Sequence, residues 1–192
     1  MMHDFIFRIL NLGPEGIGKR SLIENYISNI FDSSSKLLIG VDFLVKTVVF
    51  NEQRIKLQIW DFDIEEKYRF LSPHSALMDF GEEERYRSLF SIYCKGFDAA
   101  LVIFNTSISV DEVHEWIHLL RENSVDLPIL LIGNKLDGVD IQELNREKGS
   151  KIADDFGLLE YIEISTKTGE NVEEMFNVLI DFLVTKYGLE EI

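Results

Sequence analysis

The seven residues GPEGIGK, numbers 13 to 19, lie between an apolar run and a segment with helical spacing. The run Phe5 to Leu12 predicts a strand, and Lys19 to Phe31 predicts a helix. Glycines allow the tight turn that points successive N–H groups at phosphate oxygens, and a helix N-terminus adds partial positive charge. This order predicts a phosphate-binding loop that uses Gly13, Glu15, Gly16, Ile17, Gly18 and Lys19.

The position after the lysine departs from this kind of loop. It needs a Ser or Thr hydroxyl that ligates Mg²⁺, and here it is Arg20, whose guanidinium has no acceptor. Ser21 comes next, but one residue is about 100° of rotation on a helix, so we expect it to face elsewhere. Two alternatives stay open. Arg20 either lies against the phosphates and replaces part of the metal's charge, or points to solvent.

Strands and helices alternate along the rest of the chain. Further strands are predicted at Val41 to Phe50, Arg54 to Asp61, Ala99 to Asn105, Pro128 to Gly133 and Tyr161 to Ser165. Further helices are predicted at Ser109 to Glu122, Ile141 to Phe156 and Val172 to Tyr187. Strands separated by helices imply βα units and a mostly parallel sheet.

Two polar loops follow predicted strands. The loop Asn134-Lys135-Leu136-Asp137 follows one buried strand, and Ser165-Thr166-Lys167 follows the next. Open α/β sheets bind ligands at the carboxyl ends of their strands. A carboxylate there accepts two hydrogen bonds, which matches the ring N–H and exocyclic amine of guanine but not adenine. Together with the phosphate loop, these two loops predict a guanine nucleotide site. A glycine-rich turn that binds nothing does not explain all three.

Composition excludes several other classes of partner. The 192 residues carry a net charge of −15, which argues against nucleic acid and anionic membrane surfaces. A bound phosphate must therefore be held by local groups. The single cysteine, Cys94, excludes a disulfide within the chain and fits a reducing compartment. We find no membrane-spanning run and no C-terminal cysteine for prenylation.

These loops resemble those of the Ras superfamily of small GTPases, and the Rab branch fits best. Further Rab-like stretches are Ile39 to Phe43, Lys56 to Asp61, Arg85 to Leu89 and Tyr93 to Gly96. The resemblance covers nearly the whole chain. It implies one Ras-like G domain over residues 1–192, an α/β P-loop fold with a mostly parallel six-stranded sheet and helices on both faces.

The resemblance also assigns roles to particular residues. Asn134, Lys135 and Asp137 would read the base, supported by Ser165, Thr166 and Lys167. Phe31 would pack on the guanine. A second set, Phe43, Trp60 and Tyr93, matches an aromatic triad that Rab proteins use to bind effectors, although ordinary packing would explain these three equally well.

Several switch positions do not match the family. Leu38 stands where a threonine would hold Mg²⁺ and the γ-phosphate, while Asp61 could keep its indirect contact with the metal. The glycine and glutamine positions of switch II are Ile64 and Glu65. A glutamine both accepts and donates, whereas an ionised glutamate only accepts and adds negative charge beside the phosphates.

The segment after Asp61 is too long for the family. Residues 65–71 and 83–89 resemble each other at an offset of 18 residues, which predicts an insertion or duplication near residues 65–89. Chance similarity between two Glu/Arg-rich stretches is the alternative. In the second register Glu83 takes the glutamine position, so neither register restores the glutamine.

These observations lead to two hypotheses. One is a GDP/GTP-dependent switch with slow or partner-assisted hydrolysis, and the other is a pseudo-GTPase scaffold that binds nucleotide without turnover. A P-loop kinase or ATPase is disfavoured by the base loop. We expect GDP or GTP as the ligand, with GDP preferred, and leave Mg²⁺ open. We further expect a protein effector, no visible lipid anchor, and a cytoplasmic location, peripheral to membranes through partners.

Overall fold

The structure is a computed structural model of the chain. It describes residues 4–14, 16–27, 35–38, 41–62, 94–105, 110–135 and 142–188. Among the predicted site residues, Glu15, Phe31, Glu65, Glu83, Tyr93 and Asp137 lie outside the described residues, as does the proposed insertion near 65–89.

Seven strands form one sheet in the described part of the chain. They are β1 (Asp4–Leu12), β2 (Ser35–Leu38), β3 (Val41–Phe50), β4 (Gln53–Phe62), β5 (Ala99–Phe104), β6 (Ile129–Asn134) and β7 (Glu160–Ile164). Their spatial order is β2-β3-β4-β1-β5-β6-β7. The pairs from β4 to β7 are parallel, whereas β2–β3 and β3–β4 are antiparallel. Six strands are the predicted ones, and the short edge strand β2 is an addition.

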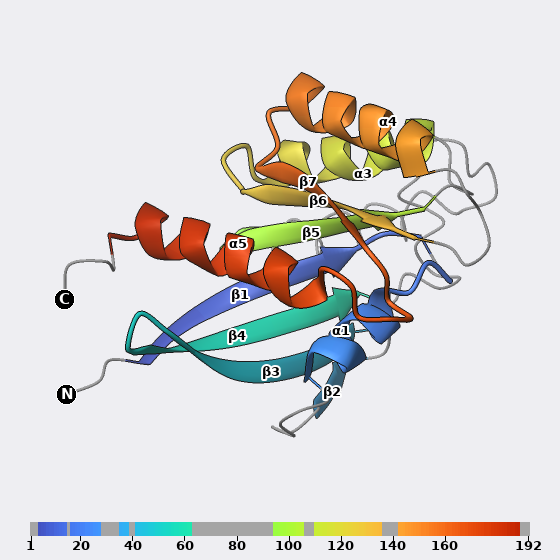
Figure 1. The fold of residues 1–192 in the computed structure, drawn as a ribbon. Helices are drawn as coiled ribbons and strands as arrows, with labels where there is room; N and C mark the ends of the chain where they lie inside the picture. The colour runs from blue at the N-terminus through green and yellow to red at the C-terminus, as the bar shows by residue number, and fades with distance from the viewer. Residues whose placement is uncertain are drawn as a thin grey trace.

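Helices cover both faces of the sheet, as predicted. They are α1 (Lys19–Ile27), α3 (Val110–Asn123), α4 (Gln142–Asp155) and α5 (Val172–Lys186). In Figure 1, α1 and α5 lie on one face, and α3 and α4 lie on the other.

Each face has its own apolar core, because successive side chains of a strand point to opposite faces. On β1, Phe7 and Ile9 join the core under α1 and α5, while Leu10 and Leu12 join the core under α3. All six residues of β5 are buried. This explains why the sequence there is a continuous apolar run, since a central parallel strand is covered on both sides.

β3 and β4 form a hairpin at Asn51-Glu52-Gln53, which separates two of the predicted strands and is itself a hairpin signal. Asn51 and Glu52 have φ angles of 47° and 64°, the left-handed pair that a two-residue hairpin turn requires. The register then runs without interruption from Phe50↔Gln53 to Val41↔Phe62. The hairpin therefore carries Asp61, near the end of β4, back beside the end of β1.

Helix α5 packs on α1, and this contact supports the loop that precedes α1. Phe176 of α5 is fully buried and stacks on Tyr26 of α1, with ring centroids 3.6 Å apart and planes 10° apart. Burial raises the pKa of Tyr26 above its ordinary value, with Glu173 adding to the shift. The phenol therefore stays neutral at this junction.

We expect Phe176→Ala to lower the free energy of unfolding by about 3 to 5 kcal/mol, the usual cost of an aromatic-to-alanine cavity. Urea denaturation measures the change. The control is Asn177→Ala on the exposed face of the same helix, which should change stability by less than about 0.5 kcal/mol. Equal effects from the two variants would contradict the packing.

Candidate functional site

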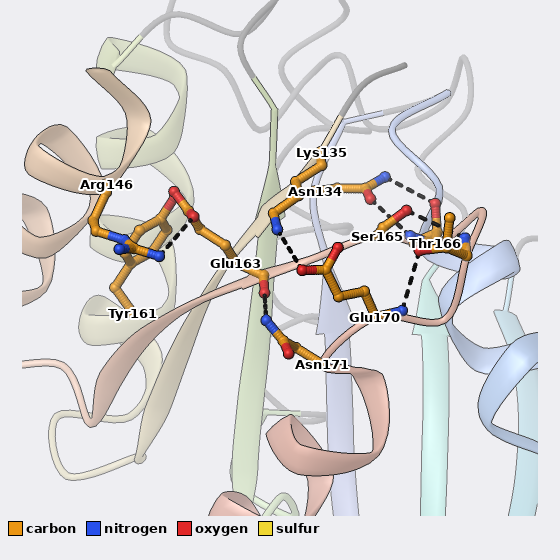
Figure 2. Close-up of polar contacts among 10 residues, drawn as sticks. Asn134, Lys135, Arg146, Tyr161, Glu163, Ser165, Thr166, Glu170 and Asn171 are labelled. Atoms are coloured by element: carbon orange, nitrogen blue, oxygen red, sulfur yellow. Dashed lines mark hydrogen bonds and ion pairs between the residues drawn. The ribbon is translucent and has the colours of Figure 1, made fainter. Parts of the chain in front are cut away.

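The candidate site lies where three loops meet at the carboxyl ends of parallel strands. The loop after β1 contains Gly13 to Gly18, while Lys135 follows β6 and Ser165 to Thr168 follow β7. Figure 2 shows the β6 and β7 loops lying together, with side chains that point toward one another. The strand order explains the meeting, because β1, β5, β6 and β7 are consecutive parallel neighbours.

The loop after β1 has the backbone that its glycines predict. Gly13, Gly16 and Gly18 have φ angles of +148°, +74° and +93°, which residues with side chains rarely adopt. A Cβ at Gly13 would lie 2.4 Å from the backbone oxygen of Ile103 on β5. The loop is therefore pressed against the neighbouring strand, and glycine is required there.

Lys19 lies inside this loop rather than on the surface. It is 6% exposed, and its Nζ donates to the backbone oxygens of Gly13 and Pro14 at 2.9 and 2.7 Å. The ammonium therefore stands within the curve of the loop at the start of α1, where a phosphate would be cradled. The described loop fits the phosphates of a nucleotide.

Asn134 joins the three loops. Its Nδ2 donates to the backbone oxygen of Ile17 at 2.6 Å and to Oγ1 of Thr166 at 3.1 Å. Its Oδ1 accepts from the backbone N–H of Thr166 at 3.1 Å. Gly18 lies against this junction, where a Cβ would be 2.7 Å from Asn134 Nδ2. One buried amide thus sets the distance between the phosphate loop and both predicted base loops.

The β7 loop is closed by its own backbone. Ser165 donates its N–H to the backbone oxygen of Glu170 at 3.1 Å, and Gly169 donates to that of Ser165 at 2.9 Å. Lys135 pairs with the Glu170 carboxylate at 2.9 Å, which ties the β6 loop to the β7 loop (Figure 2). These contacts hold the loops that would read the base.

A second group of contacts, formed by Tyr161, Glu163 and Arg146, supports β7. Tyr161 packs closely on β6 and α4. A Cβ at Gly133 would lie 2.3 Å from its hydroxyl oxygen, and a Cβ at Gly149 would lie 2.4 Å from its ring. Its hydroxyl donates to Glu163, which also pairs with Arg146 (Figure 2). Burial, then the Glu163 charge and hydrogen bond, raise the pKa of Tyr161 above its ordinary value.

The described residues give an incomplete donor set for Mg²⁺. Asp61 is 5% exposed, and its Oδ1 accepts from Nδ2 of Asn11 at 2.9 Å. Arg20 occupies the position where a hydroxyl ligand is needed and cannot ligate a cation. Among the described residues, no three His, Cys, Asp or Glu side chains gather as a metal group. Of the hydroxyl-and-carboxylate set that would hold the metal, the described residues therefore supply the Asp61 carboxylate but no hydroxyl at position 20.

Arg20 lies on the exposed side of α1 in this structure. Its Nε pairs with Glu24 one turn along α1 at 2.8 Å, and the side chains are 67% and 58% exposed. The guanidinium thus lies along the outer surface of the helix. Ser21 is also exposed, as is Lys167 of the β7 loop.

Two of the three predicted effector-binding aromatics lie together. Phe43 and Trp60 have ring centroids 5.0 Å apart with planes at 64°. Phe97, which the sequence analysis missed, lies 5.9 Å from Trp60 at 82°. The half-buried aromatics are packed edge to face, a favourable arrangement for such rings.

Three residues that contact the site were not identified from the sequence. Asn25 donates from α1 to the backbone oxygen of Thr166, and Glu170 pairs with Lys135. Nothing in the local pattern marks either of them. Asn11 had a signal, since it is the one amide in the apolar run Ile9 to Leu12.

Comparisons with known proteins agree with this geometry. A model of the Ras family matches residues 8–78 and 74–185. The human protein "Ras-related protein Rab-8B" is 29% identical over 187 residues, which cover 96% of this chain and 81% of the relative. The mouse protein "Ras-related protein Rab-12" is 30% identical over 190 residues, which cover 97% of this chain and 71% of the relative. In the described ranges, no helix is long and apolar enough to cross a membrane.

We expect Gly18→Ala to lower the free energy of unfolding of the nucleotide-free protein by about 2 to 4 kcal/mol, because it adds backbone strain and displaces the Asn134 amide. Gly157→Ala is the matched control. Gly157 also has a positive φ, +56°, but a Cβ there meets nothing within 4 Å, so only the strain of about 1 kcal/mol should appear. Equal losses in the two variants would show that the close contact at Gly18 does not matter.

Proposed function

This chain belongs to the Ras family of small GTPases and is Rab-like, and on that basis we propose that it is a GDP/GTP-dependent switch with slow or partner-assisted hydrolysis. The observation that carries the proposal is the junction at Asn134. It brings the phosphate loop within hydrogen-bonding distance of both base loops. A single ligand with phosphates at one end and a base at the other would span that arrangement.

The choice of guanine rests on the base loops. Asn134 and Lys135 lie at the end of β6, and Asp137 of the same motif supplies the carboxylate that would accept from guanine's two donors. Phe31 would pack on the base. The supporting loop of Ser165, Thr166 and Lys167 follows β7. Adenine offers no matching donors, so ATP should bind poorly.

Slow hydrolysis is proposed from the altered switch positions. Arg20, Leu38 and Ile64 replace residues that hold the metal, the γ-phosphate or the attacking water, and Glu65 or Glu83 stands at the glutamine position. The exposed Arg20–Glu24 pair supports this proposal, because Glu24 offsets the positive charge with which Arg20 could replace part of the metal's charge. A partner protein would then have to supply the missing groups.

We also propose that switch II contains extra residues. The two ranges matched by the Ras family model overlap at residues 74–78, inside the stretch near 65–89 where we propose an insertion or duplication. A match that breaks at this point supports extra residues there. The remainder of residues 1–192 would form one Ras-like domain.

Partners and location follow from the Rab-like membership. We propose a protein effector that binds the surface formed by Phe43, Trp60 and Tyr93. The acidic charge of the chain disfavours direct binding to anionic membranes. Contact with membranes would therefore come through partners.

A second candidate function is a pseudo-GTPase scaffold that holds GDP or GTP without turnover. The orientation of Arg20 toward Glu24 favours it, since the described residues then supply little positive charge for a γ-phosphate. Glu15 and Glu65 would add negative charge near the same place. For this candidate we expect GDP to be preferred over GTP and binding to depend only weakly on Mg²⁺.

We expect the nucleotide-free protein to bind GDP and GTP in a fluorescence titration, with GDP the tighter of the two. ATP should bind at least about a hundredfold more weakly, because a site built for hydrogen bonds rejects a base that lacks them. ATP binding equal to that of GTP would overturn the assignment to guanine. Each titration is made with Mg²⁺ and with EDTA.

The two candidates separate in a single-turnover assay. A switch should hydrolyse bound GTP slowly, at a rate below about 4 × 10⁻⁴ per second, which is the rate of the unassisted reaction in Ras. A scaffold should show no phosphate release above that of the Lys19→Ala variant. Tight GDP binding indifferent to EDTA, together with weak GTP binding, would also favour the scaffold.

The Arg20–Glu24 pair generates a further prediction. If Arg20 can leave Glu24 and reach the phosphates, Arg20→Ser should raise the dependence of GDP affinity on Mg²⁺. Exposed ion pairs contribute only about 0 to 1 kcal/mol, so Glu24 is a weak competitor. Glu24→Gln should therefore tighten GDP binding in EDTA by a few-fold at most, about fivefold. Unchanged affinity in both variants would show that Arg20 stays in solvent.

A further inference from the structure

Asn11 has its side-chain amide inside the apolar strand β1, two residues before Gly13 of the phosphate loop. Asn11 is fully buried between Leu10 and Leu12, which are buried as well. Its Nδ2 donates to Oδ1 of Asp61 at 2.9 Å, and the two residues are register partners across β1 and β4. Its own Oδ1 has no hydrogen-bond partner among the described residues.

The carbonyl of this amide is unfavourable for stability. A buried carbonyl oxygen without a donor loses its hydrogen bonds to water and regains none. A leucine would fill a similar volume without a buried carbonyl, although it could not donate to Asp61. A polar residue that is retained in an apolar core without improving the packing often has a function.

The hydrogen-bond partner of Asn11, the Asp61 carboxylate, indicates what function the amide could have. Asp61 is the carboxylate expected to face the metal, and it is almost completely buried. A buried carboxylate needs donors or a cation beside it. If no metal is bound, a carboxylate at this place also repels the phosphates of a nucleotide. The chain has Arg20 where a metal ligand is needed, and Arg20 is turned to Glu24.

We infer that Asn11 is a positioning residue for Asp61, and that it lowers the dependence of nucleotide binding on Mg²⁺. The inference rests on the proposed guanine nucleotide function. The Asn11 N–H holds the Asp61 carboxylate against β1 and offsets part of its charge. This is the orienting contribution that a hydrated metal ion makes where it is bound. The carboxylate is therefore kept from the phosphates when the metal is absent.

We expect Asn11→Leu to make GDP binding depend more strongly on Mg²⁺. Without the amide, Asp61 can turn toward the phosphates and repel them in EDTA, while Mg²⁺ can still draw it into place. The ratio of the GDP dissociation constants in EDTA and in Mg²⁺ should stay below about tenfold in the unaltered protein. It should rise by about tenfold or more in the variant, the effect of losing one hydrogen bond to a charged group.

Two further variants make the test specific. In an Asp61→Asn background the carboxylate is gone, so adding Asn11→Leu should leave the ratio unchanged. If leucine does not fit at position 11 and the protein fails to fold, Asn11→Ala provides the same comparison. Thermal unfolding of the nucleotide-free proteins checks the packing. Asn11→Leu should melt below the unaltered protein, because the buried Asp61 carboxylate loses a donor, and a smaller loss is expected in the Asp61→Asn background, where that position carries no charge.

The outcomes separate the inference from the proposed function. GDP binding by the unaltered protein, with the same EDTA-to-Mg²⁺ ratio in Asn11→Leu, would leave the function intact and overturn the role of Asn11. An equal effect of Asn11→Leu with and without the Asp61 carboxylate would overturn it too. If the unaltered protein binds no guanine nucleotide in either buffer, the proposed function fails and the inference fails with it.

Discussion

The hydrogen bonds of one buried amide, that of Asn134, hold together the three loops from which the site is built. They connect Ile17 of the phosphate loop to Thr166 of the loop after β7, residues that are far apart in the chain. Hydrogen bonds are stronger inside a protein than in water, and the same low dielectric makes an unpaired group costly there. The conformation of Gly18, the close approach of α1 and the place of the β7 loop all depend on this junction.

Charge divides the site into two unequal sides. On the side that would hold the base, the described loops are connected by the Lys135–Glu170 pair. On the metal side, Lys19 lies within its loop, Arg20 turns to Glu24, and Asn11 engages Asp61. These contacts therefore lie where a metal ion and a phosphate would bind. A chain with a net charge of −15 must restrain the carboxylates beside any phosphate that it binds.

Most of the fold could be predicted because its signals are local. Buried runs such as Ala99 to Phe104 and Ile129 to Asn134 identify central strands, and Asn51-Glu52 identifies a hairpin turn. The edge strand β2 was missed because its four residues, Ser35–Leu38, show neither alternation nor a long apolar run. It is formed by pairing with β3, so its partner decides its conformation. The same holds for Phe97, whose place beside Trp60 depends on the packing of distant segments.

The sequence by itself determined the order of strands and helices, the glycine-rich phosphate loop and the loops that would read a base. Periodicity, turn residues and motif spacing all lie within short stretches of chain, where local physics acts. Only the tertiary structure decided that Asn134 joins the three loops, that Arg20 pairs with Glu24, and that Asn11 meets Asp61 across 50 residues of sequence. Such contacts depend on the register of neighbouring strands and on the choice among rotamers. Neither is specified until distant elements pack together.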